Sequence, residues 1–423
     1  MKDLADLMPD TVAGHAPLDW GVVIVFALVY LGMFLGGLPR LRLDRSGVAL
    51  LGAIAVIGLG ALDVSKAAQA IDLPTILLLF SFMVISAQMR LGGFYTAVAL
   101  WIGTRPWSRS ALLATLVFVA GSLSAVFSND VICLAMTPIV ARVCLSRGLA
   151  PVPFLVGLTC AANVGSAATL IGNPQNMLIG SVLGLDFGRY LLQAAPPALA
   201  GLFVLWLWLV FATGRGDARP ALANVNQLHA DAPPFDRGQT VKGLVVVTAV
   251  LVAFLATDWP HEVVALVAAG VLLLSRRLHS AEVMGTVDWS LLVLFMGLFV
   301  VNRAFEQTGL AAELVAALTR QGIVLGDLVP LTVVGVTLSN IVSNVPAVML
   351  LLPHLQEETQ GVLLALVSTF AGNLLLVGSI ANLIVADLAR QQGIEIGWRE
   401  HARIGIPVTL FTLAIVLLWM APR

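Results

Sequence analysis

The stretch FSNDVICLAMTPIV, residues 127–140, places three polar residues in the middle of an apolar run that extends from Ala111 to Val143. Inside a bilayer an unpaired polar group is costly, so a polar triplet at this depth needs a reason. Serine, asparagine and aspartate are the preferred N-cap residues of helices. The pattern therefore predicts that a half-helix begins at residues 128–130, with free N–H groups and its positive dipole end facing a site within the membrane.

The composition of the whole chain supports a membrane setting. Of the 423 residues, 59% are apolar types and only 11% are charged, and the mean hydropathy is +0.96. Soluble domains have about 45–50% apolar and about 25% charged residues, so this chain cannot cover a water-facing surface of its size. An ordinary soluble enzyme and a disordered chain are excluded, and no basic cluster is dense enough for nucleic acid. We predict an all-α polytopic membrane protein.

The apolar segments and the basic residues together predict the topology. Ten segments are candidate spans: Trp20–Leu38, Gly47–Leu62, Pro74–Met89, Pro153–Val182, Tyr190–Phe211, Gly243–Thr257, Glu262–Ser275, Trp289–Val301, Gly361–Ala389 and Ile404–Met420. Two interrupted stretches, Ala111–Val143 and Val324–Leu352, fit either a broken helix or a re-entrant hairpin. If both are hairpins, 17 of the 23 Lys and Arg residues fall on one face, as the positive-inside rule requires. We therefore expect ten spans, two re-entrant hairpins, a location in the cell (inner) membrane and both termini on its outer side.

The two halves of the chain align with one another. Ile71–Phe94 aligns with Val287–Leu310 at an offset of 216, and the Ser-Asn pair at 128–129 aligns with that at 343–344 at an offset of 215. Residues 172–179 align with 378–385 at an offset of 206. The span count runs the paired segments in opposite directions, which predicts inverted repeats. We expect an extracytoplasmic N-terminus (1–19), a first repeat (20–212), a cytoplasmic linker (213–240) and a second repeat (241–423).

Polar residues interrupt the apolar runs at four places, and these supply the candidate substrate- and ion-binding site. The places are the hairpin tips 128–130 and 343–346 and the broken helices 153–183 and 361–390. The candidate residues are Ser128, Asn129, Asp130, Asn163, Ser166, Thr169, Gly172, Asn173, Asn176, Ser343, Asn344, Asn373, Gly378, Ser379 and Asn382. Amides, hydroxyls and unwound carbonyls suit a sodium ion or a hydrogen-bonded oxyanion. The alternative is close helix packing, which uses the same residue types.

Two features have separate interpretations. Asp130 has no mate in the second repeat, where Val345 stands, and we expect it to carry the coupling ion, either a proton or a cation. The alternative is that Asp130 only caps its helix. Cys133, Cys144 and Cys160 could together bind a metalloid, although small hydrophobic packing is the stronger interpretation. We expect no other metal and no cofactor beyond a possible bound sodium ion.

The motifs FSNDVICLAMTPIV and SNIVSNVPAVMLLLP, with the later breaks LIGNPQN and LVGSIANLIV, resemble the ion-transporter superfamily. This group includes citrate transporters, divalent anion/sodium symporters, arsenite permeases and sodium/proton antiporters, and the Asn-Asp tip looks most similar to the arsenite and anion permeases. The resemblance implies an elevator-type movement, hairpin tips that line the site and a homodimer formed through scaffold helices. Asp130 and Val345-Pro346 depart from the symporters' Ser-Asn-Thr tips, which favours proton coupling or a single cation.

We therefore expect a secondary active transporter, not an enzyme, that moves a small anion or arsenite with a proton or sodium gradient. The alternatives are a sodium/proton antiporter without an anion substrate, and the membrane subunit of an ATP-driven arsenite pump with a soluble ATPase partner. The chain itself contains no P-loop motif.

Overall fold

The computed structural model describes residues 17–37, 42–213 and 235–421. These residues form helices joined by short loops, and no β-strand occurs among them, so the all-α prediction is confirmed. The helices group into two compact units. Unit 1 contains the described residues up to Leu73 together with Trp289–Leu325, and unit 2 contains Pro74–Asp288 and the described residues from Gly326 onward.

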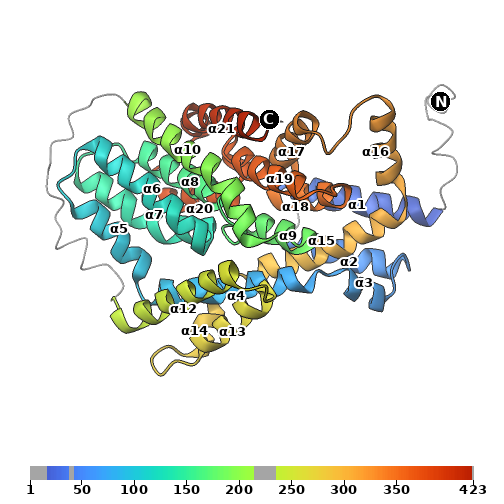
Figure 1. Cartoon of the computed structure of the whole chain (residues 1–423), viewed down its shortest axis with the longest axis horizontal. Coiled ribbons are helices and arrows are strands. Elements are labelled where there is room, and N and C mark those ends of the chain that lie inside the picture. Colours follow the sequence, from blue (N-terminus) through green and yellow to red (C-terminus); the bar gives the residue numbers. More distant parts are fainter. Residues whose placement is uncertain (1–16, 38–41, 214–234, 422–423) are drawn as a thin grey trace. The chain divides into compact units, whose positions relative to one another are not determined.

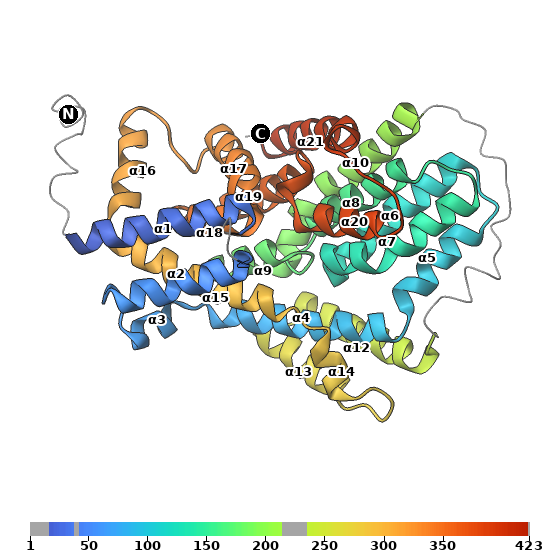
Figure 2. The same ribbon diagram turned by 180° about the vertical axis from the view of Figure 1, so that it is seen from behind.

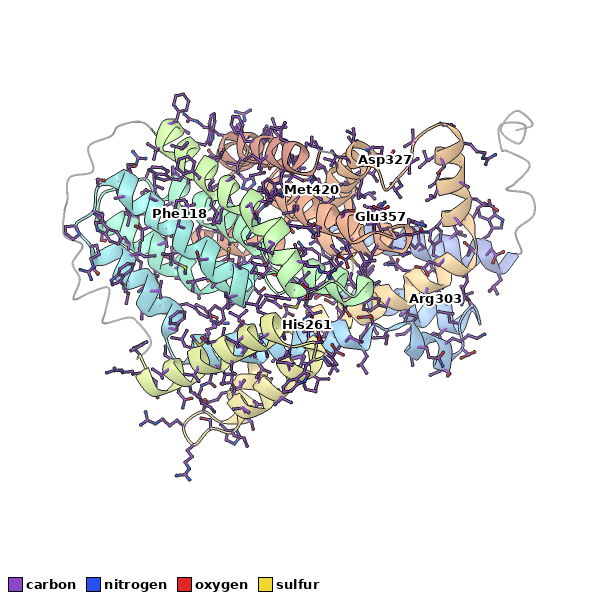
Figure 3. The ribbon with its side chains drawn as sticks, in the orientation of Figure 1. Phe118, His261, Arg303, Asp327, Glu357 and Met420 are labelled. Atoms are coloured by element: carbon purple, nitrogen blue, oxygen red, sulfur yellow. The ribbon has the colours of Figure 1, made fainter. Side chains whose placement is uncertain are left out.

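Unit 1 is a small helical bundle built on close contact between two helices. Its helices are α1 (Pro17–Leu35), α2 (Arg45–Gly58), α3 (Val64–Ala70), α15 (Trp289–Gln307) and α16 (Leu310–Arg320). Gly297 of α15 lies directly against the backbone of Ala49 in α2, where a side chain would not fit. Tyr30 donates its hydroxyl proton to Asn302 Oδ1 at 2.8 Å. Arg303, labelled in Figure 3, forms a 3.3 Å ion pair with Glu306.

Unit 2 contains the remaining helices and all of the candidate site residues. Its first half has α4 (Leu73–Leu91, which begins at the unit boundary), α5 (Phe94–Thr104), α6 (Arg109–Phe127), α7 (Asn129–Ser146), α8 (Pro151–Ser166), α9 (Pro174–Leu183) and α10 (Phe187–Thr213). Its second half has α12 (Arg237–Ala256), α13 (His261–Leu273), α14 (Ser280–Gly285), α17 (Leu328–Val342), α18 (Asn344–Leu351), η2 (Leu352–His354), α19 (Glu358–Ala371), η3 (Leu376–Gly378), α20 (Ile380–Arg390) and α21 (Trp398–Met420). Helices α10 and α21 lie side by side in Figure 1 and, from behind, in Figure 2.

Both interrupted stretches form helical hairpins. The guanidinium of Arg147, which follows α7, donates to the carbonyls of Arg105 (3.3 Å) and Trp107 (2.8 Å), which precede α6. The chain therefore returns to the end where it entered. In the second hairpin, Gly326 before α17 lies against the side chain of Gln360 at the start of α19. Figure 3 marks this end with the labels of Asp327 and Glu357. A single crossing by a broken helix is excluded for both stretches.

The number of membrane crossings stays a prediction. Eight described helices are long and apolar enough to span a membrane: α1, α4, α6, α7, α10, α12, α15 and α21. They include both arms of the first hairpin, whereas α2 and α13, which we expected to span, have only 14 and 13 residues. At 1.5 Å per residue these two helices are about 20 Å long, shorter than the ~30 Å hydrocarbon core.

Some sequence predictions lie partly outside the described residues. This applies to residues 1–16 of the predicted N-terminal segment and to residues 214–234 of the predicted linker. The ends of both segments are helical, because α1 begins at Pro17, α10 runs to Thr213 and α12 begins at Arg237.

Candidate ion- and substrate-binding site

Two helices of unit 2 are interrupted where the sequence predicts breaks. Between α8 and α9 the chain leaves the helix over residues 167–173, and between α19 and α20 it does so over residues 372–379, where only η3 is helical. Asn173 Oδ1 accepts the Asn176 N–H at 2.9 Å, and Ser379 Oγ accepts the Ala381 N–H at 3.2 Å. Each residue thereby caps the helix that follows, as the asparagine and serine at these positions predict.

The same pair of hydrogen bonds, from one asparagine amide to two backbone carbonyls, stabilises both breaks. In the first break, Asn176 Nδ2 donates to the carbonyls of Thr169 (2.9 Å) and Ser166 (3.4 Å). The equivalents in the second break, 206 residues further on, repeat this pattern: Asn382 Nδ2 donates to the carbonyls of Leu375 (3.1 Å) and Gly372 (2.8 Å). The unwound carbonyls are thus paired by a side chain from the next helix, which buried backbone requires. The matching bonds confirm that residues 166–176 and 372–382 are structural equivalents.

The two breaks are also joined to each other by reciprocal hydrogen bonds. Asn163 Oδ1 accepts from Ser379 Oγ (3.2 Å), and Asn163 Nδ2 donates to Asn382 Oδ1 (3.3 Å). Thr369, 206 residues after Asn163, makes the converse contacts: its Oγ1 accepts from Asn173 Nδ2 (3.2 Å) and donates to Asn176 Oδ1 (3.5 Å). When residue i contacts j′ and its equivalent i′ contacts j, a two-fold pseudo-axis relates the pieces. This is the arrangement that inverted repeats predict.

The two hairpin tips share an unusual backbone conformation. Ser128 has φ +73° and ψ 133°, and Ser343 has φ +77° and ψ 160°. They are the only residues other than glycine with positive φ in the described part of the chain. Neither serine caps the following helix with its side chain, so the first N–H groups of α7 and α18 keep no such partner. Conformations of this kind cost about 1–3 kcal/mol and persist at binding sites.

Each tip faces the break of its own repeat. The Asn129 backbone N–H donates to the Gly172 carbonyl at 3.1 Å, and Asn129 Nδ2 donates to Asn163 Oδ1 at 2.9 Å. In the second repeat the amide of Asn344 lies beside Gly372, where a Cβ would come within 3.0 Å of its Nδ2. The structure therefore brings both tips and both breaks into one polar region of unit 2.

Four amide atoms in this region have no hydrogen-bond partner among the described residues. They are Oδ1 of Asn129, Asn340 and Asn344, and Nδ2 of Asn373. Leaving such a buried group unpaired costs about 1–3 kcal/mol, so each is available for a ligand. Neither lysine nor arginine hydrogen-bonds to these asparagines within the described ranges, and no group of three His, Cys, Asp or Glu residues there could hold a metal ion.

Most of the remaining predicted residues hold the two breaks in shape through hydrogen bonds or close packing. Ser166 Oγ donates to the Asn163 carbonyl at 2.8 Å and accepts from Asn173 Nδ2 at 3.0 Å. Thr169 Oγ1 donates to the Ala125 carbonyl of α6. A Cβ on Gly172 would overlap the backbone of Ser166, and one on Gly378 would approach the Gly372 carbonyl. These residues, with Asn163, Asn173, Asn176, Ser379 and Asn382, shape the breaks.

Asp130 lies in the first turn of α7 and is half-buried. Its two interpretations, a carrier of the coupling ion or a cap of its own helix, both stay predictions. Cys133, Cys144 and Cys160 are all buried and free, and they form no group of three that could hold a metal ion in the described part of the chain.

Several polar residues of this region were missed by the sequence analysis, among them Asn340, whose Oδ1 is unpaired in the described structure, and Gln175, whose Nε2 donates to Thr369 Oγ1 at 3.3 Å. Thr159 Oγ1 donates to Asn382 Oδ1 at 2.7 Å, and Thr369 is the reciprocal partner described above. Tyr190 and His401 contact backbone carbonyls of the two breaks. Extending the 206-residue offset backward from Gly172 would have paired Thr369 with Asn163, although nothing in the sequence marks Thr159.

We expect Ser343→Gly to raise the thermal stability, because glycine adopts this backbone conformation without the steric cost that serine bears. The expected gain is about 1 kcal/mol in the free energy of unfolding, measured as a Tm increase of a few degrees in detergent. Ser343→Val should lower the Tm instead. Equal Tm values for the three proteins would show that the tip is not strained.

The comparisons with known proteins agree with this architecture. Residues 22–371 match the citrate transporter family, and the chain belongs to this family. The resemblance to the ion-transporter superfamily is thereby confirmed. The protein is a multi-pass membrane transporter.

Individual relatives cover nearly the full chain. An uncharacterized transporter of Mycobacterium tuberculosis, MT2759, is 32% identical over 93% of this chain and 98% of its own length. The silicon efflux transporter LSI3 of Oryza sativa subsp. japonica is 29% identical over 93% of this chain and 95% of its own. The crystal structure of the Alcanivorax borkumensis YdaH transporter covers 95% of this chain and 96% of its own, with 16% identity and a TM-score of 0.56, and supports the fold alone.

Proposed function

We propose that this protein is a secondary active transporter that moves a small anion or a metalloid weak acid, coupled to a proton or sodium gradient. The observation that carries the proposal is the pair of hairpin tips, where Asn129 and Asn344 each bury an unpaired amide oxygen next to a helix N-terminus that no side chain of the N-cap serine caps. Amide oxygens are ligands for a hard cation, and helix N-termini stabilise an anion. The two kinds of ligand lie at the same tips, which is the requirement for coupling ion to substrate.

The chemistry of the tips favours a weakly charged substrate. No guanidinium or ammonium group hydrogen-bonds to the unpaired amides in the described ranges, so N–H groups and a co-bound cation would balance the substrate's charge. The silicon efflux relative is named for a metalloid, which agrees with a hydroxylated metalloid such as arsenite as the substrate. A sodium/proton antiporter without anion substrate is the second candidate, favoured by Asp130 in the first tip.

The proposed setting combines the expected topology with the homodimer and the elevator-type movement that the resemblance to the ion-transporter superfamily implies. The protein lies in the cell inner membrane with the 213–240 segment in the cytoplasm, forms a homodimer through scaffold helices and moves its hairpins and breaks in an elevator-like step. Work as the membrane subunit of an ATP-driven pump would require a separate soluble ATPase.

Purified protein in proteoliposomes tests the transport proposal. Arsenite, silicic acid, a dicarboxylate, phosphate and sulfate are each presented under an imposed proton or sodium gradient, and an internal pH dye reports proton movement. We expect gradient-driven movement of one of the solutes. Dye signals on adding sodium without movement of any solute would identify the antiporter instead.

Asp130→Asn is expected to abolish gradient-driven accumulation while solute exchange at equal concentrations continues. The reason is that asparagine has nearly the same size as aspartate and can still hydrogen-bond, but cannot take up a proton or offer a charge to a cation. The measurement compares net uptake with exchange in the same vesicles. Full accumulation with an unchanged pH dependence would exclude Asp130 as the coupling residue.

A further inference from the structure

Two helices that follow the breaks, α10 and α21, are structural equivalents. They begin 211 residues apart, at Phe187 and Trp398. An internal proline follows at the same offset in each, Pro196 and Pro407. The same offset pairs a tyrosine in the first turn of α10, at position 190, with His401 in the first turn of α21.

Tyr190 and His401 each contact a backbone carbonyl of one break, the first through a phenol and the second through an imidazole. Tyr190 donates its hydroxyl proton to the Ala167 carbonyl at 2.9 Å, and His401 Nε2 lies 3.0 Å from the Asn373 carbonyl. Ala167 and Asn373 are themselves equivalent, 206 residues apart at the start of the two breaks. Both side chains are 1% exposed. Each break is therefore held by one buried ring from the helix that follows it.

The hydrogen bond of His401 defines its protonation. A ring nitrogen can bond to a carbonyl only as a donor, so Nε2 carries the hydrogen and Nδ1 of the neutral ring is bare. Nδ1 is buried and has no partner among the described residues. A second proton, taken from water, would form an N–H bond at Nδ1 with no acceptor opposite it. The packing around the ring must then open.

Two hydrogen bonds between side-chain amides connect Asn373, the residue that His401 contacts, to the first hairpin tip. Asn373 Oδ1 accepts from Asn163 Nδ2 at 2.9 Å, and Asn163 Oδ1 accepts from Asn129 Nδ2 at 2.9 Å. Gly405 lies against the Asn373 carbonyl and leaves room for the ring, because a Cβ there would overlap both. The ring thus holds the segment that presents Asn373 to the first repeat.

We propose that His401 is a positioning residue that makes the second break sensitive to pH, while Tyr190 keeps the first break insensitive. A phenol keeps its proton throughout the physiological range, whereas an imidazole changes charge near neutral pH. The neutral ring holds the Asn373 segment, and protonation releases it. Any effect of this pH sensitivity on transport rests on the proposed function, but the release of the Asn373 segment by protonation does not.

No other charged group in the described elements that pack on α21 faces the ring. Of these elements, α17 and η3 contain no titratable residue, and α8 contains only Cys160. Helices α10 and α19 carry the ion pair of Arg189 and Glu358. Trp208, near the C-terminal end of α10, donates its Nε1 proton to the Arg403 carbonyl, so this end of α10 lies near His401. Arg189 is in the first turn of α10, at the opposite end of the helix, and its partner Glu358 lies there with it. On α21 itself the neighbouring charged residues are Arg399, Glu400 and Arg403, and all three are exposed.

Hydrogen exchange of the full-length protein in nanodiscs tests the proposal without requiring transport. Peptides covering 372–379 and 166–173 are followed at pH values of about 5.5 and 8, with correction for intrinsic exchange rates. We expect the corrected exchange of 372–379 to be about fivefold or more faster at the lower pH, because one lost hydrogen bond is worth about 1 kcal/mol. The 166–173 peptide should not change.

Two substitutions separate titration from packing. His401→Gln keeps an N–H donor and His401→Tyr copies the first repeat, so both should remove the pH dependence of 372–379. Tyr190→Phe is the matched control and should raise exchange of 166–173 equally at both pH values. Equal pH dependence of the two wild-type segments, or a wild-type pH dependence in both His401 variants, would overturn the proposal. Vesicles that transport none of the solutes would refute the proposed function and leave this result standing.

Discussion

An Asn344→Ala variant should fold as the wild type does and lose roughly 10- to 100-fold of its transport rate. The side chain has a buried Oδ1 without a partner in the described structure, so removing this oxygen breaks no internal hydrogen bond. A hydrogen bond or ion contact to a charged ligand is worth about 1.5–3 kcal/mol, and each 1.4 kcal/mol corresponds to a factor of about ten. The measurement pairs initial uptake rates in proteoliposomes with Tm in detergent.

The control is Gln307→Ala, an exposed amide at the end of α15, which should change neither rate nor Tm. Asn129→Ala should lose transport similarly but also some stability, because its Nδ2 is bonded to Asn163. If Asn344 were a packing residue, its alanine variant would show a lower Tm and a normal rate per folded molecule. That pattern would remove Asn344 from the binding site.

Gly165→Ala is expected to prevent folding of unit 2. Gly165 in α8 lies directly on Gly121 in α6, and a Cβ at position 165 would overlap the Gly121 carbonyl and Cα. Backbone atoms cannot turn aside as a side chain does, so the two helices must separate. Overpacking costs about 1–3 kcal/mol even where side chains can adjust, and a larger loss is expected here. Size-exclusion chromatography and Tm in detergent measure the effect.

The matched control for this variant is Gly270→Ala in α13, where no atom lies within 4 Å of the added Cβ. Alanine is a better helix former than glycine by about 1 kcal/mol, so this variant should be as stable as the wild type or more stable. A monodisperse Gly165→Ala protein with an unchanged Tm would mean that α6 and α8 are not in close contact.

The polar interruptions in the sequence predicted the breaks well. Asn173-Pro174 and Ser379 mark the start of α9 and α20 because a capping side chain is a local requirement that leaves a local signal. The positive-inside count chose hairpins over single crossings, and the contacts of Arg147 agree. Charge placement carries topological information that hydropathy alone does not.

Two short helices of the fold were not predicted from the sequence pattern. Helices α5 and α16 were missed because each has only 11 residues and joins a longer apolar segment. Both follow a left-handed glycine, Gly93 or Gly309, at the offset of 216 that relates the repeats. The alignment had therefore already reached their first residues without distinguishing them.

The sequence predicted many of the residues that lie in the site, but it did not distinguish their roles. Asn129 and Asn173 have the same chemistry and both stand at breaks, yet Asn173 is committed to a helix cap and Asn129 retains a free oxygen. Only the set of partners separates them, and partners up to 223 residues apart in the chain are not visible in a local pattern. His401 was passed over because a lone histidine shows no spacing that points to a partner.

The reciprocal bonds between the breaks also constrain how the chain is made. When synthesis has reached the 213–240 segment, Asn163 and Asn173 are already in place but Thr369, Ser379 and Asn382 are not. Until the second half is synthesised, the amides of the first half lack these hydrogen-bond partners or bond to other groups, because the N-terminal part of a chain is made first. A chain stopped after the first half should therefore be recognised and degraded, whereas co-expressed halves that meet in the membrane should rescue each other.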